Sequence, residues 1–144
     1  MKRNLQKTLG AIAAVMLAFT CQESFCQTVK DASDKTIGYV QSDGRVQDGS
    51  HRTIGYIKSD GTIQNSSHKT VARLKSDGTV QDASYKTIGE IKSDGTVRGK
   101  GGKVLGYVKD GGKVEDSSHR TIGRVSGIPK KKAAIYFFFN FFKS

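Results

Sequence analysis

The stretch RTIGYIKSDGTIQNSSH, residues 52–68, decides how this chain folds, because it is repeated along most of the sequence. Close copies of these 17 residues begin at Lys35, Lys69, Lys86 and Lys103, and a partial copy, RTIGRV, occupies residues 120–125. A fixed period without insertions is the signature of one small structural unit repeated side by side. The fold can therefore be argued from a single copy.

Three positions of the repeat are always aliphatic, and most of their residues are β-branched. The first position holds Ile37, Ile54, Val71, Ile88, Leu105 and Ile122; the second holds Val40, Ile57, Leu74, Ile91, Val108 and Val125; the third holds Val46, Ile63, Val80, Val97 and Val114. Short β-branched runs bounded by turn residues are typical of strands. We expect these positions to form the core of an all-β fold.

A turn signal stands between the second and third aliphatic positions. It is Asp43-Gly44, Asp60-Gly61, Asp77-Gly78 and Asp94-Gly95 in four copies, and Asp110-Gly111-Gly112 in the last full copy. Asp-Gly between two β runs is a strong hairpin signal, because both residues tolerate the positive φ of a tight turn. Each copy is predicted to be a hairpin with a KTIGYV-like first strand and a TVQD-like second strand.

The link to the next copy is Asp-x-Ser-His or a variant, as in residues 48–51 and 65–68. An Asp or Asn at the start of such a link can accept a hydrogen bond from the backbone two residues further on. The repeated Asp therefore has a local structural explanation and needs no acid chemistry.

A small residue follows the first aliphatic position in every copy. These residues are Gly38, Gly55, Ala72, Gly89, Gly106 and Gly123. The first and second aliphatic positions are three residues apart, which would place them on opposite faces of a straight strand. We expect a bulge or a close approach of another backbone at the small residue, which would bring both to one face.

The two ends of the repeat array complement each other. Residues 28–33, TVKDAS, match a second strand and its link, whereas the array ends on a lone first strand at residues 120–125. Pairing of these two strands would close the array into a ring without exposed edges. Counting that pair gives six hairpins, of which five are uninterrupted, so five and six petals both remain open.

The iterated IGY(V/I)xSDGxVxDxS(H/Y)(K/R) units, over residues 28–125, resemble the five-fold β-flower proteins, small exported bacterial proteins whose hairpins are petals about an axis. The resemblance implies a closed all-β ring of short two-stranded hairpins, and it implies no activity. The alternative is a β-solenoid with one 17-residue coil per turn. Solenoid coils do not reverse the chain, whereas Asp-Gly hairpins do, so we favour the ring.

Residues 1–26 are predicted to be a signal peptide. Basic residues at positions 2–7 precede an uncharged apolar run at residues 9–20, and small residues precede a cleavage point before Gln27. The run is shorter than the about 20 residues of a spanning helix, which makes a retained anchor the alternative. We expect export to the periplasm, the outer membrane or the extracellular space.

Both cysteines, Cys21 and Cys26, lie in this leader, so a chain that starts at Gln27 has no disulfide and must be held together by packing. Lipidation of Cys21 is an open alternative to simple cleavage. After the leader we assign residues 27–128 to the hairpin repeat domain and residues 129–144 to a tail rich in Lys and Phe.

The formal net charge of the whole chain is +11. The leader holds three bases and one acid, so the remaining residues carry +9, and four of these charges are Lys130, Lys131, Lys132 and Lys143 in the tail. The mild excess in the repeats indicates solubility and weak attraction to polyanions. It does not indicate a nucleic-acid site.

The tail, KKKAAIYFFFNFFKS at residues 130–144, brings the aromatic bulk that the repeats lack. Its phenylalanines are Phe137, Phe138, Phe139, Phe141 and Phe142. A segment that is apolar on all sides is buried or in a membrane, and residues 133–142 are about half the length of a span. The tail plugs or caps the ring, lies in a membrane interface, or pairs with another chain. We favour a plug, because it would enlarge a thin aliphatic core.

No catalytic, metal or cofactor site emerges from the repeats. His51, His68 and His119 share one repeat position, but they stand on petals that splay outward, so we expect exposed histidines and no metal site. The Asp-Gly turns lack the alternating acids of a calcium loop. No Ser, Cys or carboxylate departs from its repeat equivalents, as a catalytic residue usually does.

The leading functional interpretation is a non-catalytic exported module of the bacterial cell envelope, structural or ligand-binding. Tyr39, Tyr56 and Tyr107 form part of an outward face for carbohydrate or another envelope component, although tyrosines on strands are often plain β-formers. The alternatives are a membrane-associated protein anchored by the tail, and a hydrolase whose residues the sequence does not identify. The membrane contacts would be Lys130, Lys131, Lys132, Phe137, Phe138, Phe139, Phe141 and Phe142.

Overall fold

The protein, as a computed structural model that describes residues 27–142, consists of short strands followed by one α-helix. The predicted signal peptide, with Cys21, lies outside the described residues. The strands are β1 (Thr28–Asp31), β2 (Thr36–Val40), β3 (Arg45–Asp48), β4 (Thr53–Ile57), β5 (Thr62–Asn65), β6 (Thr70–Leu74), β7 (Thr79–Asp82), β8 (Thr87–Ile91), β9 (Thr96–Gly99), β10 (Val104–Val108), β11 (Lys113–Asp116) and β12 (Thr121–Ser126). A 3-10 turn, η1 (Lys100–Gly102), joins β9 to β10, and the helix is α2 (Lys130–Phe138).

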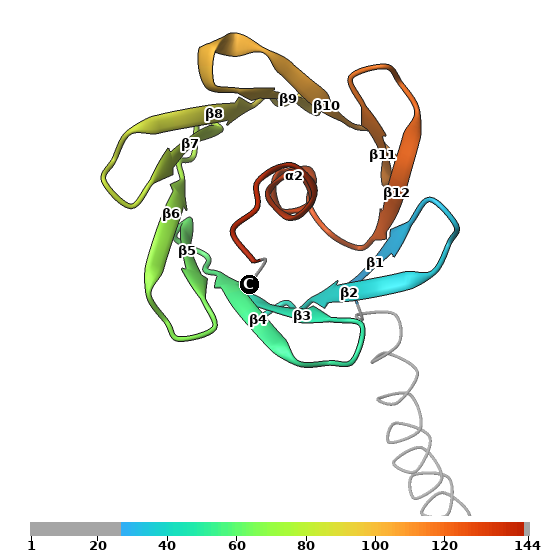
Figure 1. Ribbon diagram of the computed structural model, residues 1–144, viewed down its shortest axis with the longest axis horizontal. Helices are drawn as coiled ribbons and strands as arrows, with labels where there is room; N and C mark the ends of the chain where they lie inside the picture. Colours follow the sequence, from blue (N-terminus) through green and yellow to red (C-terminus); the bar gives the residue numbers. More distant parts are fainter. Residues whose placement is uncertain (1–26, 143–144) are drawn as a thin grey trace, which may run out of the picture.

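The strands form one closed antiparallel barrel in which each strand pairs with its neighbours in the chain (Figure 1). The ring closes where β1 pairs with β12, with Val29 opposite Val125. This is the pairing that the unmatched strands at the two ends of the array predict, and it is confirmed. Among the twelve described strands, closure leaves no edge open to another chain.

The strands that stand outward as petals are not the pairs that the sequence indicated. The Asp-Gly turns do join paired strands, such as β2 and β3. The loops that project outward in Figure 1, however, are the Asp-x-Ser-His links between β1 and β2, β3 and β4, and so on round the ring. Each petal is therefore a second strand followed by a first strand, and six uninterrupted petals result from the twelve strands.

Both kinds of connection have the same backbone geometry. In an Asp-Gly turn, Gln41 N donates to Arg45 O at 2.8 Å, and Gly44 has φ 100°. In a link, Asp48 N donates to Arg52 O at 2.9 Å, and His51 has φ 67°. Each is a type I turn followed by one left-handed residue. Of the two residues in the Asp-Gly signal, only the glycine takes positive φ.

A bulge lies in every petal, one residue before the predicted place. Between β3 and β4, Val46 is opposite Gly55 and Gln47 is opposite Thr53, so Ile54 has no partner residue. The first aliphatic position, which includes Ile54, is only partly buried against the core. The second and third positions are buried, with the exception of Leu74, which is partly buried.

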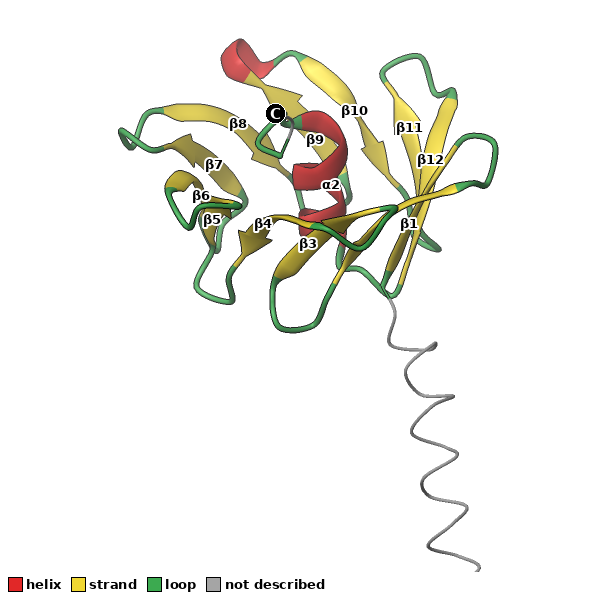
Figure 2. Cartoon of the chain, turned by 60° about the horizontal axis from the view of Figure 1, so that its bottom comes forward, coloured by secondary structure: helices red, strands yellow, loops and turns green. Residues whose placement is uncertain are grey.

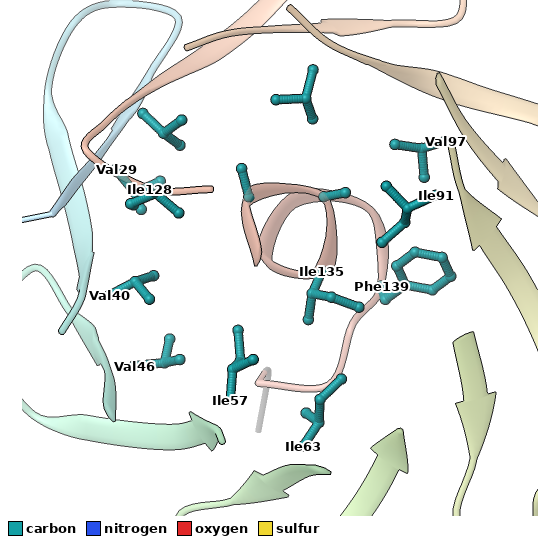
Figure 3. Packing of buried hydrophobic residues seen from close by; sticks show 14 of the residues in the cluster. Val29, Val40, Val46, Ile57, Ile63, Ile91, Val97, Ile128, Ile135 and Phe139 are labelled. Atoms are coloured by element: carbon teal, nitrogen blue, oxygen red, sulfur yellow. The ribbon is translucent and has the colours of Figure 1, made fainter. Parts of the chain in front are cut away.

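Helix α2 stands inside the ring (Figures 1 and 2). Ala133, Ala134 and Ile135 are fully buried, and Phe139 is 8% exposed. In Figure 3 the side chains of Ile135 and Phe139 lie among valines and isoleucines of the surrounding strands. The interpretation of the tail as a plug is confirmed, because Ala133, Ala134, Ile135 and Phe139 belong to the same core cluster as the strand residues. Between residues 27 and 142, no helix has the length and apolar character required to cross a bilayer.

Replacement of Ile135 by Ala should lower the free energy of unfolding by about 2–5 kcal/mol, because it leaves a cavity in the middle of the ring. Urea unfolding monitored by circular dichroism measures this change. Asn140 is exposed in the same segment, so Asn140→Ala is the control and should change the value by no more than about 0.5 kcal/mol. Equal stability of I135A and N140A would contradict a helix packed in the ring.

Candidate functional site

The inner face of the ring is occupied by the aromatic side chains of the tail. A Cβ atom at Gly89 would lie 2.8 Å from the Phe139 ring and 2.6 Å from the backbone oxygen of Arg98. A Cβ atom at four other glycines would likewise lie too close to a tail ring: Gly38 to Tyr136, Gly55 to Phe142, Gly106 to Phe138, and Gly123 to Phe137. The predicted close backbone approach is present at these glycines, but the tail aromatic on each glycine was not foreseen. The available signal was that six small repeat positions, five glycines and Ala72, are matched by six aromatic residues in the tail.

The outer face carries a regular set of stacked rings. Tyr39 stacks on His51 with ring centroids 4.3 Å apart, Tyr56 on His68 at 4.4 Å, and Tyr107 on His119 at 4.5 Å. At a fourth petal the guanidinium of Arg73 lies 4.1 Å from the centroid of Tyr85. In each pair the second residue follows the first by 12 positions. That spacing was visible in the sequence and was missed.

Each stack joins two neighbouring petals. Tyr39 lies on β2, whereas His51 is the left-handed residue of the turn between β3 and β4. A left-handed backbone costs a residue with a side chain about 1–3 kcal/mol, and an aromatic pair contributes about 0.5–1.5 kcal/mol. The stack thus offsets part of the cost. Where the strand residue is Glu90, the position 12 residues later is Gly102, which adopts φ 84°.

The stacks reduce the tyrosine surface that is open to the proposed carbohydrate ligand. Tyr39, Tyr56 and Tyr107 are half-buried, and an imidazole covers one face of each ring. Contact of these tyrosines with a sugar stays a prediction, and it would have to use the ring edges or the other ring face.

The repeated carboxylates hold the turns. Asp48 Oδ1 accepts hydrogen bonds from Ser50 N at 2.9 Å and Arg52 N at 3.0 Å. Asn65 accepts the equivalent pair with an uncharged amide oxygen. Backbone hydrogen bonds are the main reason why the pKa is lowered at Asp48, Asp60, Asp77, Asp94 and Asp116. The hydrogen bond from Lys130 does the same for the pKa of Asp110.

The histidines are not gathered into one site. His51, His68 and His119 are exposed on separate petals, and His119 Nδ1 lies 3.3 Å from Glu115 Oε1. Within residues 27–142 there is no group of three or more His, Cys, Asp or Glu side chains that could hold a metal ion. The arrangement offers one His–Glu pair, with Lys113 Nζ 4.0 Å from the same carboxylate, and no metal centre among these residues.

These features define a class: a closed ring of antiparallel hairpin repeats that is plugged by its own C-terminal helix. A family model described as 5-fold beta-flower protein matches residues 26–142. Because the match covers most of the chain, the protein belongs to this family, which confirms the resemblance carried by the repeats. No curated protein and no solved structure matches the chain. This member departs from the five-fold description, since its twelve strands make six petals.

The Tyr56–His68 stack should contribute coupling energy to stability. In a double-mutant cycle with Tyr56→Leu and His68→Asn, which keeps a residue that tolerates the left-handed conformation, we expect about 0.5–1.5 kcal/mol of coupling. Urea unfolding of the four proteins measures it. Tyr56→Leu combined with His119→Asn is the control and should be additive within about 0.5 kcal/mol. Coupling no larger than in the control would show that the stack does not stabilise the ring.

Acid should destabilise the ring through its turn carboxylates. The pKa of these carboxyls is lower in the folded state than the value of about 3.9 in the unfolded chain. The ionised carboxylate therefore stabilises the fold at pH values above the unfolded pKa. This stabilisation is lost as the pH falls through the folded pKa. We expect stability to decline below about pH 4. Asp48→Asn/Asp116→Asn keeps the acceptors, as Asn65 does naturally, and should flatten the decline. Urea unfolding from pH 2.5 to 7 tests this, and an equally steep decline in the variant would refute it.

Proposed function

We propose that this beta-flower protein is a non-catalytic module exported to the bacterial cell envelope, where it is structural or binds a ligand. The observation that supports this proposal is how the repeat residues are used. The aliphatic and glycine positions build the wall and the lumen, and the repeated carboxylates hold turns. What remains for interaction is the outer face of the petals and the two ends of the ring.

A hydrolase remains an alternative without named residues. The beta-flower fold is not that of a known enzyme family. The carboxylates with lowered pKa are ionised at neutral pH and already accept backbone or lysine hydrogen bonds, which is the opposite of what a general acid requires.

Membrane association through the tail is the second alternative, and it stays a prediction. Inside the ring, Phe137, Phe138 and Phe139 face glycines, and Lys130 forms an ion pair with Asp110. Insertion of these phenylalanines into a membrane would require the helix to leave the ring. That step would expose Ile135 and the strand residues around it, which is unfavourable by about 25 cal/mol for each Å² of apolar surface.

Export is tested by expressing the full chain with a C-terminal tag in a Gram-negative bacterium, separating the cell fractions and measuring the intact mass. We expect a chain that begins at Gln27 in the periplasmic or membrane fraction, because residues 1–26 have the pattern of a cleaved leader. The matched control lacks residues 9–20 and should stay uncut in the cytoplasm. Cys21→Ser separates the two leader alternatives, since it would abolish a lipid mass only if Cys21 is the lipidated residue. A full-length cytoplasmic chain would refute the proposal.

A further inference from the structure

The two ends of the ring differ, because antiparallel strands place the petal links at one end and the Asp-Gly turns at the other. We call the end with the Asp-Gly turns the turn end; it consists of residues 41–45, 58–62, 75–79, 92–96 and 109–113. Helix α2 begins at this end, where Lys131 Nζ donates to Ser76 O at 2.9 Å and Lys130 pairs with Asp110. Lys130 and Lys131 are therefore held among the turns.

A cavity of about 430 Å³ lies at the turn end, between turns 58–62 and 75–79. This volume is within the range of small-molecule sites, about 300–1,000 Å³. Four lysines line it, Lys58, Lys75, Lys131 and Lys132, together with the apolar residues Leu74 and Pro129. Of the residues that the structure describes, Asp60 is its only lining carboxylate. The cavity thus combines four cations with an apolar wall.

The positive charge of this cavity is only partly neutralised by its neighbours. Asp60 Oδ1 accepts a hydrogen bond from Thr62 N at 2.9 Å, and the nearby charge of Lys58 helps to lower the pKa of this carboxyl. Within residues 27–142, Lys58, Lys75 and Lys132 belong to none of the ion pairs of the ring. Ammonium groups around an apolar recess favour a ligand with several negative charges.

The next cavity round the ring shows that the repeat alone does not produce this charge. It lies between turns 75–79 and 92–96, has a volume of about 490 Å³, and also includes Lys131. Its charged lining is Lys92 and Lys131 against Asp77, Glu90 and Asp94. Equivalent turns therefore form one cationic and one anionic cavity, and Lys132 lines only the cationic one.

The dipole of helix α2 does not explain the three lysines in its first turn. Lys130, Lys131 and Lys132 occupy the first turn of α2, which has no acidic residue and no side-chain cap. Cations in the first turn of a helix are disfavoured by the helix dipole. Lys130 gains an ion pair with Asp110 and Lys131 a hydrogen bond to Ser76 O, whereas among the described residues Lys132 has no such contact. A local rule that is broken without a compensating gain is typical of a functional position.

We propose that the cationic cavity binds a phosphate group that carries an apolar substituent. Lys58, Lys75 and Lys132 hold the phosphate oxygens, with Lys131 beside them, and the substituent rests on Leu74 and Pro129. Lysine binds phosphate as a point charge and needs no fixed geometry, which suits long side chains on turns. The ligand is a free phosphorylated molecule or the phosphate of a lipid head group. The site is independent of whether the chain is exported.

Hexyl phosphate and inorganic phosphate, titrated into the purified full chain at low salt by calorimetry, test the site. We expect saturable binding of one hexyl phosphate, tighter than inorganic phosphate because of the apolar wall, and weaker binding as salt rises. Lys58→Gln/Lys132→Gln should weaken it by at least about ten-fold, since hydrogen bonds between charged groups are lost. Lys69→Gln/Lys92→Gln is the control: it removes the same charge, and Lys92 has the repeat position of Lys58. The control should change the affinity by less than about two-fold.

Vesicles of phosphatidylcholine with and without phosphatidylglycerol distinguish the two sources of phosphate. Saturable binding of hexyl phosphate without vesicle binding indicates a free ligand. Vesicle binding that needs phosphatidylglycerol and is lost in K58Q/K132Q indicates a lipid head group. Either result supports the site. Equal weakening by K69Q/K92Q would overturn it, because charge alone would then suffice. Failure to bind either probe would overturn it too. Vesicle binding that persists in K58Q/K132Q and at high salt would also overturn the proposal, because it would indicate membrane contact through the tail aromatics.

Discussion

The width of the ring is the constraint on which the rest of this structure depends. A barrel of about eight strands can be filled by its own side chains, and a wider one leaves a lumen. This ring has twelve strands, and its inward residues are mostly valine and isoleucine. They are too short to meet across the axis. Helix α2 fills the space, so the aromatic residues that are absent from the repeats are supplied once, by the tail.

The glycine that follows the bulge adapts the repeat to this plug. Tail rings lie where a side chain at Gly38, Gly55, Gly89, Gly106 or Gly123 would stand. A larger residue would push either the tail or the neighbouring strand away, because the space is closed from both sides. The same position thus permits close strand packing and the insertion of the helix, which joins the stability of the wall to that of the plug.

Symmetry also explains where a functional site can arise. Equivalent residues of the petals are engaged in equivalent structural work: aspartates hold turns, and tyrosines stack on the histidine of the next petal. A single helix inside a six-fold ring must break this equivalence, because it presents different side chains to each petal. The lysines at its start therefore give one cavity of the turn end a charge that the next cavity lacks.

The sequence by itself determined the local structure of this protein: the strands, the turns, the carboxylates that hold the links, and the pairing of the ends. These follow from short-range chemistry, since turn residues and β-branched runs act within a few positions of each other. Only the tertiary structure decided that the petals are the pairs joined by Asp-x-Ser-His, that there are six of them, and that the tail lysines border a cavity between turns 58–62 and 75–79. The reason is physical: the tilt of paired strands, the closure of the ring and the rotation of the helix inside it depend on contacts between residues far apart in the chain, and no single repeat contains them.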